Sequence, residues 1–277
     1  MKIVIGKNSG FCFGVRRAIT GVEEQIKKYK QVECLGHLVH NEVVTSELEE
    51  KGVRFVNSIS EVKNNSVLVI RAHGVAENIY KEANQKNIKL IDYTCPKVCQ
   101  IHKKIKEAAN NGYQIILIGK KDHPEVIGSK GYADNVIVLE GIDDIDKLDN
   151  YNKVFVIVQT TFSYDKYKLI EEALKKKYRK IQFVNSICES TRLRQEECKE
   201  IARNVDFMII IGGTKSSNTQ KLYDIAYSIN KNCIMVQDEN DDSIKECKKY
   251  DTIGIMSGAS TPDYIVDNIV NKLNNNM

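Results

Sequence analysis

The sequence predicts an α/β protein built from three similar lobes, and two observations support this fold class. Short apolar runs such as "QIILI" and "FMIII" alternate with longer helical patterns along the 277 residues. This alternation is typical of small parallel sheets covered by helices. The order of strands, helices and polar loops also repeats three times, with a period of about 90 residues that falls within the usual range for a domain. We expect lobes at 14–95, 96–187 and 188–277, with the third completed by the N-terminal strand in 1–13.

Each repeat contains a short strand that ends on a cysteine. The three segments are "MKIVIGKNSGFC", "NIKLIDYTC" and "KIQFVNSIC", which end on Cys12, Cys95 and Cys188. A helical pattern follows each cysteine. Thr94 and Ser190 are expected as helix N-caps, and Pro96 suits a first helical turn.

The next strand of each repeat leads into a polar loop at a constant distance from the cysteine. These strands are "QVECLGHLV", "YQIILIGKK" and "FMIIIGGT". The loops begin at His40, His123 and Ser216, each 28 residues after Cys12, Cys95 or Cys188. Two positions further on lie Glu42, Glu125 and Asn218. The identical spacing indicates that the three segments occupy equivalent places in the fold.

Two more strands close each repeat, and the last strand again ends in a polar loop. The closing segments are "VLVIRAHG", "VFVIVQTT" and "TIGIMSGAS", which reach His73, Thr160 and Ser260. Ligands of open α/β sheets bind beyond the carboxyl ends of the strands. We therefore expect a pseudo-threefold (trefoil-like) arrangement that directs these loops and the three cysteines into one central cavity.

The eight cysteines require an explanation other than disulfides. The start "MKIVIGKNSG" indicates a buried strand instead of a signal peptide, so a cytoplasmic, reduced protein is expected. Without an apolar run of about 18 residues, no membrane helix is expected. Packing explains the cysteines outside the repeat, namely Cys34, Cys99, Cys198, Cys233 and Cys247. Three convergent cysteines suit an iron–sulfur cluster with one open iron, whereas zinc would need a fourth ligand or a water.

The polar loops favour an anionic substrate. Three of the five histidines, together with "KSSN", Thr160 and Ser260, provide hydrogen-bond donors at loops that open helices, which suits a phosphate or diphosphate. A P-loop is excluded because "GGTKSSNT" lacks its spacing. Glu125 is the best carboxylate for proton transfer, but Glu42 occupies the same repeat position and the residues alone leave the choice open. The net charge of +4 without a basic, aromatic stripe gives no reason to expect nucleic-acid binding.

Seven motifs in order resemble one family closely: "GFCFGVRRAI", "RAHG", "YTCPKV", "HPEV", "QTTFS", "SSNT" and "SGAS". It is the 4-hydroxy-3-methylbut-2-enyl diphosphate reductase (LytB or IspH) family of the non-mevalonate isoprenoid pathway. The resemblance implies that Cys12, Cys95 and Cys188 hold a [4Fe–4S] cluster with one open iron. It also implies a diphosphate site made of His40, His73, Ser216, Ser217, Asn218 and Ser260. His123 matches a substrate and proton-relay position, Glu125 the proton donor, and Thr160 a residue that holds the departing oxygen.

The implied reaction is reductive removal of an allylic hydroxyl, which yields isopentenyl and dimethylallyl diphosphate and water. Its electrons are expected from ferredoxin or flavodoxin, and a monomer is expected. A hydro-lyase would also use three cysteines and an open iron, but its carboxylic-acid substrates would require several arginines, and only Arg71 lies near a loop. A zinc-stabilised binding module would require cysteine pairs or a fourth ligand in the repeat, and neither is present.

Overall fold

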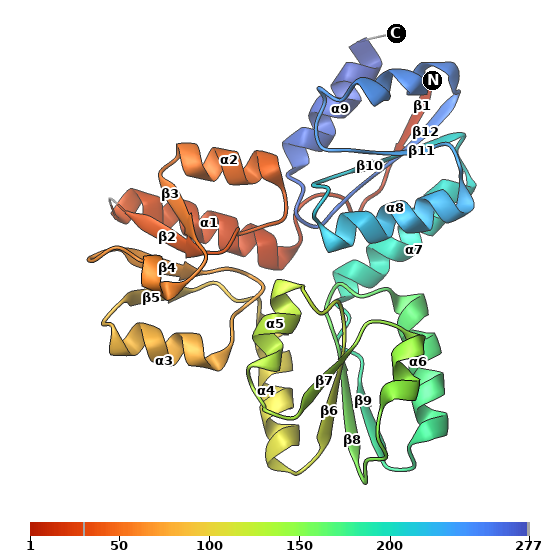
Figure 1. Ribbon diagram of the computed structural model, residues 1–277. Coiled ribbons are helices and arrows are strands. Elements are labelled where there is room, and N and C mark those ends of the chain that lie inside the picture. Colours follow the sequence, from red (N-terminus) through yellow and green to blue (C-terminus); the bar gives the residue numbers. More distant parts are fainter. Residues whose placement is uncertain (30, 276–277) are drawn as a thin grey trace. The chain divides into compact units, whose positions relative to one another are not determined.

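The computed structural model describes residues 1–29 and 31–275 (Figure 1). It divides into two compact units. The first unit contains Met1–Ile19, His37–Val53 and the residues from Glu189 onward, and the second contains Thr20–Gly36 and Arg54–Cys188. Three four-stranded sheets form the framework, each with helices packed against it. The prediction of three similar α/β lobes is therefore confirmed.

The strands of each sheet are short and their defined pairings are parallel. The first sheet has the order β3 (Val53–Val56), β2 (Val32–Leu35), β4 (Val67–Ile70) and β5 (Lys89–Asp92). The second has the order β7 (Val136–Leu139), β6 (Gln114–Ile118), β8 (Val154–Val158) and β9 (Ile181–Val184). The third has the order β1 (Lys2–Ile5), β12 (Thr252–Ser257), β10 (Phe207–Ile211) and β11 (Cys233–Val236). The N-terminal strand thus pairs with the last strand of the chain.

The helices follow the strands in the order that the repeat predicts. They are α1 (Phe13–Lys28), α2 (Glu42–Glu50), α3 (Glu77–Gln85), α4 (Pro96–Asn110), α5 (Pro124–Lys130), α6 (Tyr164–Lys177), α7 (Glu189–Arg203), α8 (Ser217–Ile229) and α9 (Asp263–Asn275). Pro96 begins α4 as predicted, but the N-cap is Cys95 instead of Thr94, and Ser190 lies inside α7. Within the described ranges, no helix is both long and apolar enough to cross a bilayer.

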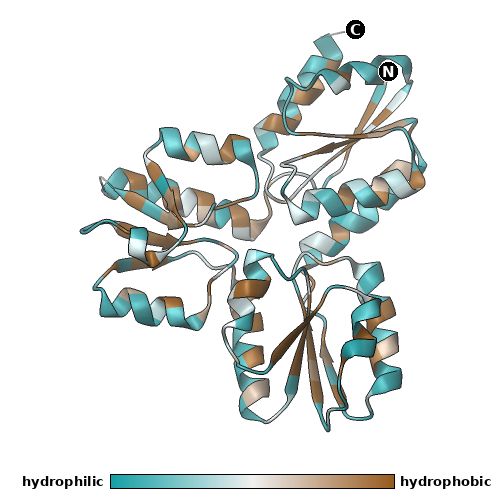
Figure 2. Ribbon diagram, viewed as in Figure 1, coloured by the Kyte–Doolittle hydropathy of each residue, from teal (hydrophilic) through white to brown (hydrophobic). Residues whose placement is uncertain are grey.

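The second sheet shows why its strands are continuously apolar. Side chains alternate between the faces of a strand, and both faces of this sheet are buried. Ile116 and Ile118 pack with Ile170 and Leu174 of α6. Their neighbours Ile115 and Leu117 pack on the other face with residues of α4 and α5. Figure 2 shows the same pattern, with hydrophobic strands between helices whose outer faces are hydrophilic.

The third sheet follows the same rule. Phe207, Ile209 and Ile211 of β10 share a core with α9, whereas Met208 and Ile210 share another with α7 and α8. Parallel pairing sets β10 beside β12, and β12 beside β1. The loops that follow β1, β10 and β12 therefore lie at the same carboxyl edge of this sheet.

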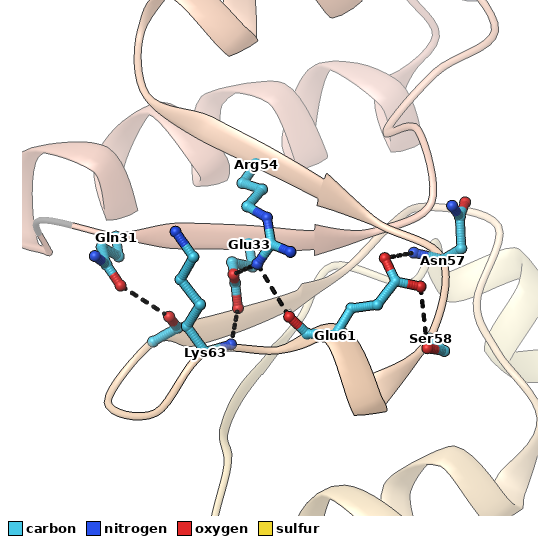
Figure 3. Close-up of polar contacts among 8 residues, drawn as sticks. Gln31, Glu33, Arg54, Asn57, Ser58, Glu61 and Lys63 are labelled. Carbon is cyan, nitrogen blue, oxygen red and sulfur yellow. Dashed lines mark hydrogen bonds and ion pairs between the residues drawn. The ribbon is translucent and has the colours of Figure 1, made fainter.

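One buried carboxylate interrupts the apolar pattern of the first sheet. Glu33 of β2 accepts hydrogen bonds from the Arg54 guanidinium and from the backbone N–H of Lys63 at 2.9 Å (Figure 3). Its side chain is only 2% exposed, whereas that of Arg54 is 42% exposed. A buried charge is costly unless it is paired, so Arg54 and the Lys63 amide are what make Glu33 tolerable in the strand.

Candidate active site

The three cysteines of the repeat occupy the same place in their sheets, between the end of an edge strand and the start of a helix. Cys12 lies between β1 and α1, Cys95 between β5 and α4, and Cys188 between β9 and α7. Each backbone N–H donates to a carbonyl in the loop after the neighbouring strand: Cys12 to Ala259 at 3.1 Å, Cys95 to Ala72 at 3.0 Å and Cys188 to Thr160 at 2.9 Å. The same hydrogen bond thus fixes each cysteine beside the last polar loop of its lobe.

Exposure separates these cysteines from the four buried ones. Cys12, Cys95 and Cys188 are partly exposed, and none of the eight cysteines forms a disulfide. Burial raises the pKa of four other thiols to about 12, so they remain protonated; these are Cys34, Cys198, Cys233 and Cys247. Because the thiolate is the metal ligand, these four are poor ligands. Cys99 is exposed on α4, so the prediction that it packs in the interior is wrong.

Glu125, Thr160 and Cys188 form a connected group in the second unit. Glu125 lies in the first turn of α5 and is 2% exposed. One of its carboxylate oxygens accepts the backbone N–H of Thr160, and the other accepts the Thr160 hydroxyl, both at 2.6 Å. The carbonyl of Thr160 accepts the N–H of Cys188. A single residue therefore connects the candidate acid to a candidate metal ligand.

Two histidines adjoin this group. His123 is the N-cap of α5, and its Nδ1 accepts the backbone N–H of Glu125 at 3.2 Å. A ring nitrogen that accepts carries no proton, so the proton of the neutral ring lies on Nε2. The ring of His73 lies edge-on to that of His123, with 5.4 Å between the ring centroids. The second unit thus brings together His73, His123, Glu125 and Thr160.

The first unit contains the other polar residues, grouped at the start of α8. Ser216 is the N-cap, and its Oγ accepts the N–H of Thr219 at 3.3 Å and lies 3.5 Å from the Ser260 hydroxyl that donates to it. Ser217 is the first helical residue. Asn218 is 5% exposed, and neither of its amide atoms has a hydrogen-bond partner among the described residues. A buried amide without partners is costly, so it indicates a ligand-binding position.

His40 lies beside the same loop. A Cβ atom on Gly213 would be 2.3 Å from the backbone oxygen of His40, so only glycine allows the two loops to approach this closely. The start of α8 adds unpaired backbone N–H groups and the positive end of the helix dipole. His40, Ser216, Ser217, Asn218 and Ser260 are thus suited to an anion.

The structure also separates Glu42 from Glu125. The Glu42 side chain is 45% exposed at the start of α2, and one of its oxygens lies 3.9 Å from Nζ of Lys215. A carboxylate in the first helical turn is favourable without any catalytic role. Glu125 instead is buried and contacts Thr160. Burial and a defined partner favour Glu125 for proton transfer, a distinction that the repeat does not contain.

Sequence reasoning missed two residues that hold the Cys12 loop. Arg194 and Glu197 lie on α7, and both bond to residues of the loop between β1 and α1. Nothing in the pattern "TRLRQEEC" distinguishes them from surface charges. Only the burial of Arg194, which is 3% exposed, marks it as unusual.

Comparison with known proteins gives matches over nearly the full chain. The family model described as LytB protein matches residues 3–274. A relative from Clostridioides difficile (strain 630), named 4-hydroxy-3-methylbut-2-enyl diphosphate reductase, is 42% identical and covers 99% of this chain and 100% of its own. A relative of the same name from Alkaliphilus oremlandii (strain OhILAs) is 38% identical with the same coverage.

A solved structure matches as well. The E-1-hydroxy-2-methyl-but-2-enyl-4-diphosphate reductase from Plasmodium falciparum is 34% identical, with a TM-score of 0.94 over 98% of this chain and 87% of that chain. The full-length matches confirm the resemblance inferred from the seven motifs. The chain belongs to the LytB protein family.

Proposed function

We propose that this protein reduces (E)-4-hydroxy-3-methylbut-2-enyl diphosphate to isopentenyl and dimethylallyl diphosphate, the last step of the non-mevalonate isoprenoid pathway. Its relatives carry the name of this reductase and match it end to end. The observation that carries the proposal is the group formed by the Glu125 carboxylate, Thr160 and Cys188, because it joins a buried proton donor to a metal ligand.

Cys12, Cys95 and Cys188 hold a [4Fe–4S] cluster. Three equivalent, partly exposed thiols fit a cluster with three cysteine ligands and one iron without a protein ligand. When bound, the cluster supplies single electrons and a Lewis acid for the hydroxyl group.

The diphosphate is held by hydroxyl, amide, imidazole and backbone donors. Ser216, Ser217 and the start of α8 supply hydroxyl and backbone donors, and the buried Asn218 amide gains the partners that it lacks in the described chain. His40, His73 and Ser260 complete the set. These groups position the allylic end of the substrate and exclude water from the reacting bond.

Once protonated, Glu125 donates the proton that converts the departing hydroxyl to water. Thr160 holds the carboxyl group in place and orients the leaving oxygen, while His123 presents its Nε2 proton. In balance, the alcohol takes up two electrons and two protons, the C–O bond breaks, a C–H bond forms and water leaves. The electrons come from a one-electron carrier such as ferredoxin or flavodoxin, and a cytoplasmic monomer is the expected form.

An anaerobic assay tests the proposal. Purified protein with reconstituted iron and sulfide, a low-potential reductant and the hydroxymethylbutenyl diphosphate is expected to yield both isoprenoid diphosphates. The protein is expected to be brown, and Asn218→Ala is expected to raise KM at least about tenfold with the cluster retained. A colourless, zinc-loaded protein with full activity would overturn the proposal.

A further inference from the structure

The loop that carries Cys12 differs from the other two cysteine loops in length. Seven residues (6–12) separate β1 from α1, compared with three (93–95) between β5 and α4 and four (185–188) between β9 and α7. Fixing a longer loop costs more conformational entropy. The Cys12 loop therefore needs more restraints to present its thiolate in one position.

The two short loops are restrained by their own residues. The Asp92 carboxylate accepts both the N–H and the hydroxyl of Thr94, at 2.7 Å and 2.5 Å. Ser186 bonds to the backbone of Val158, and Asn185 accepts the N–H of Ile187. In each case the side chain belongs to the loop or to the strand before it, although Ser186 reaches the neighbouring strand β8, 28 residues away in the sequence.

The Cys12 loop is instead held from outside, by α7. The Glu197 carboxylate accepts the backbone N–H of Lys7 at 2.7 Å and both the backbone N–H and the side-chain amide of Asn8 at 2.9 Å. One turn earlier on the same helix, the buried Arg194 guanidinium donates to the carbonyl of Gly10 at 2.6 Å. Residues three apart share a helix face, so both side chains reach the loop from the same side.

The end of β12 and the start of α9 complete the restraint of Gly10. Its N–H donates to Ser257 Oγ at 2.6 Å, so both of its backbone polar groups have partners from distant parts of the chain. Its φ of +85° favours glycine, and a Cβ would lie 1.8 Å from Asp263. These two hydrogen bonds thus hold Gly10 in a left-handed conformation two residues before Cys12.

We propose that Arg194 and Glu197 are positioning residues that hold the Cys12 loop in its ligand geometry before the cluster binds, and so slow loss of the cluster. The part that concerns the cluster rests on the proposed function. The part that concerns the loop does not, because it applies to the metal-free protein. Helix α7 begins directly after Cys188, so the residues that hold the Cys12 loop follow another proposed ligand closely in the sequence.

The test compares Arg194→Met, Arg194→Lys and Glu197→Gln with Glu196→Gln, a matched control on the same helix whose exposed carboxylate pairs with Arg192. In metal-free protein, hydrogen exchange of segment 6–12 is expected to rise at least about tenfold in Arg194→Met and Glu197→Gln, because each variant loses charge-assisted bonds. Exchange in β10 is expected to stay unchanged. Arg194→Lys, which keeps the charge, is expected to restore part of the protection.

In reconstituted protein, iron release to a chelator is expected to be about tenfold faster in Arg194→Met and Glu197→Gln than in wild type and Glu196→Gln. Unchanged exchange and unchanged iron release in folded Glu197→Gln would overturn the proposal, even if Arg194→Met fails to fold. A wild-type protein that binds no iron, but whose segment 6–12 loses protection in the variants, would instead contradict the proposed function and support the loop restraint.

Discussion

The hydrogen bonds of Glu125 predict that Glu125→Gln removes catalysis while sparing the fold. Glutamine has nearly the same shape, and its amide oxygen still accepts the backbone N–H of Thr160. Its amide NH₂ donates to the Thr160 oxygen, whose hydroxyl proton turns away. Both contacts survive as neutral hydrogen bonds, which are about half as strong as charge-assisted ones. We expect the free energy of unfolding to fall by only about 1 kcal/mol.

The effect on turnover is expected to be much larger. An amide cannot donate the proton that the leaving hydroxyl requires, and general acid catalysis contributes about 10²- to 10⁴-fold. We therefore expect kcat to fall by about this factor while KM and the cluster spectrum stay close to wild type. Glu125→Ala, in contrast, leaves the buried N–H of Thr160 without an acceptor and is expected to cost about 3 kcal/mol of stability as well.

The assay is anaerobic turnover with a chemical reductant, measured beside thermal unfolding and iron content. Glu42→Gln is the matched control, because Glu42 has the same repeat position but is exposed. It is expected to turn over at a rate near wild type. A Glu125→Gln enzyme that is folded, loaded with cluster and within about threefold of wild-type kcat would refute the assignment of Glu125 as the acid.

Three further predictions concern other parts of the chain. Burial lowers the pKa of His102 from 6.5 to about 4, so between these pH values the unfolded chain binds a proton that the folded chain does not. The free energy of unfolding is therefore expected to fall by up to about 3 kcal/mol as the pH decreases from 6.5 to 4, and by much less in His102→Gln. Urea titrations at several pH values measure this difference. Arg54→Met leaves the buried Glu33 with the Lys63 amide as its remaining partner among the described residues and is expected to cost about 2 kcal/mol in urea unfolding. Cys188→Ser is expected to abolish the brown colour and bound iron, and Cys99→Ser to keep both.

Each of these predictions has an outcome that contradicts it. If the stability of wild type and of His102→Gln depended equally on pH, the pKa of His102 would not be lowered by folding. Lys86→Met is the control for Arg54→Met, because it removes an exposed ion pair with Glu82 and is expected to cost less than about 1 kcal/mol of stability. Equal losses of stability in the two variants would contradict the role assigned to the burial of Glu33. Normal iron content in Cys188→Ser would exclude that cysteine as a ligand.

The sequence predicts the repeated part of this fold well because each sequence repeat corresponds to one lobe with the same order of strands and helices. The constant interval between each cysteine and its polar loop reflects a helix and a strand of nearly equal length in each lobe. Apolar runs mark the strands of the second and third sheets, which are buried on both faces. Helix ends are predicted less well: Thr94 and Ser190 miss the N-cap by one or two residues, as is usual for termini.

Properties that depend on distant partners were not predictable. Cys99 follows Cys95 by one helical turn, and only the packed structure shows that its face of α4 is exposed. The repeat cannot separate Glu42 from Glu125, because the difference lies in a partner 35 residues away from Glu125 along the chain. Arg194 reaches Gly10 across 184 residues, and no local pattern contains that contact.

The repeated cysteine hydrogen bond shows which feature of the lobes fixes the candidate site. In each sheet the donor is the backbone N–H of a cysteine after the edge strand, and the acceptor is a backbone carbonyl after its neighbour. Because main-chain groups form this bond, its geometry follows from parallel register and tolerates changes in the side chains around it. A shift of β9 against β8 by one residue would move Cys188 away from Thr160, and with it from Glu125. The register of the strands, more than any single polar side chain, therefore holds the candidate acid and the candidate metal ligand together.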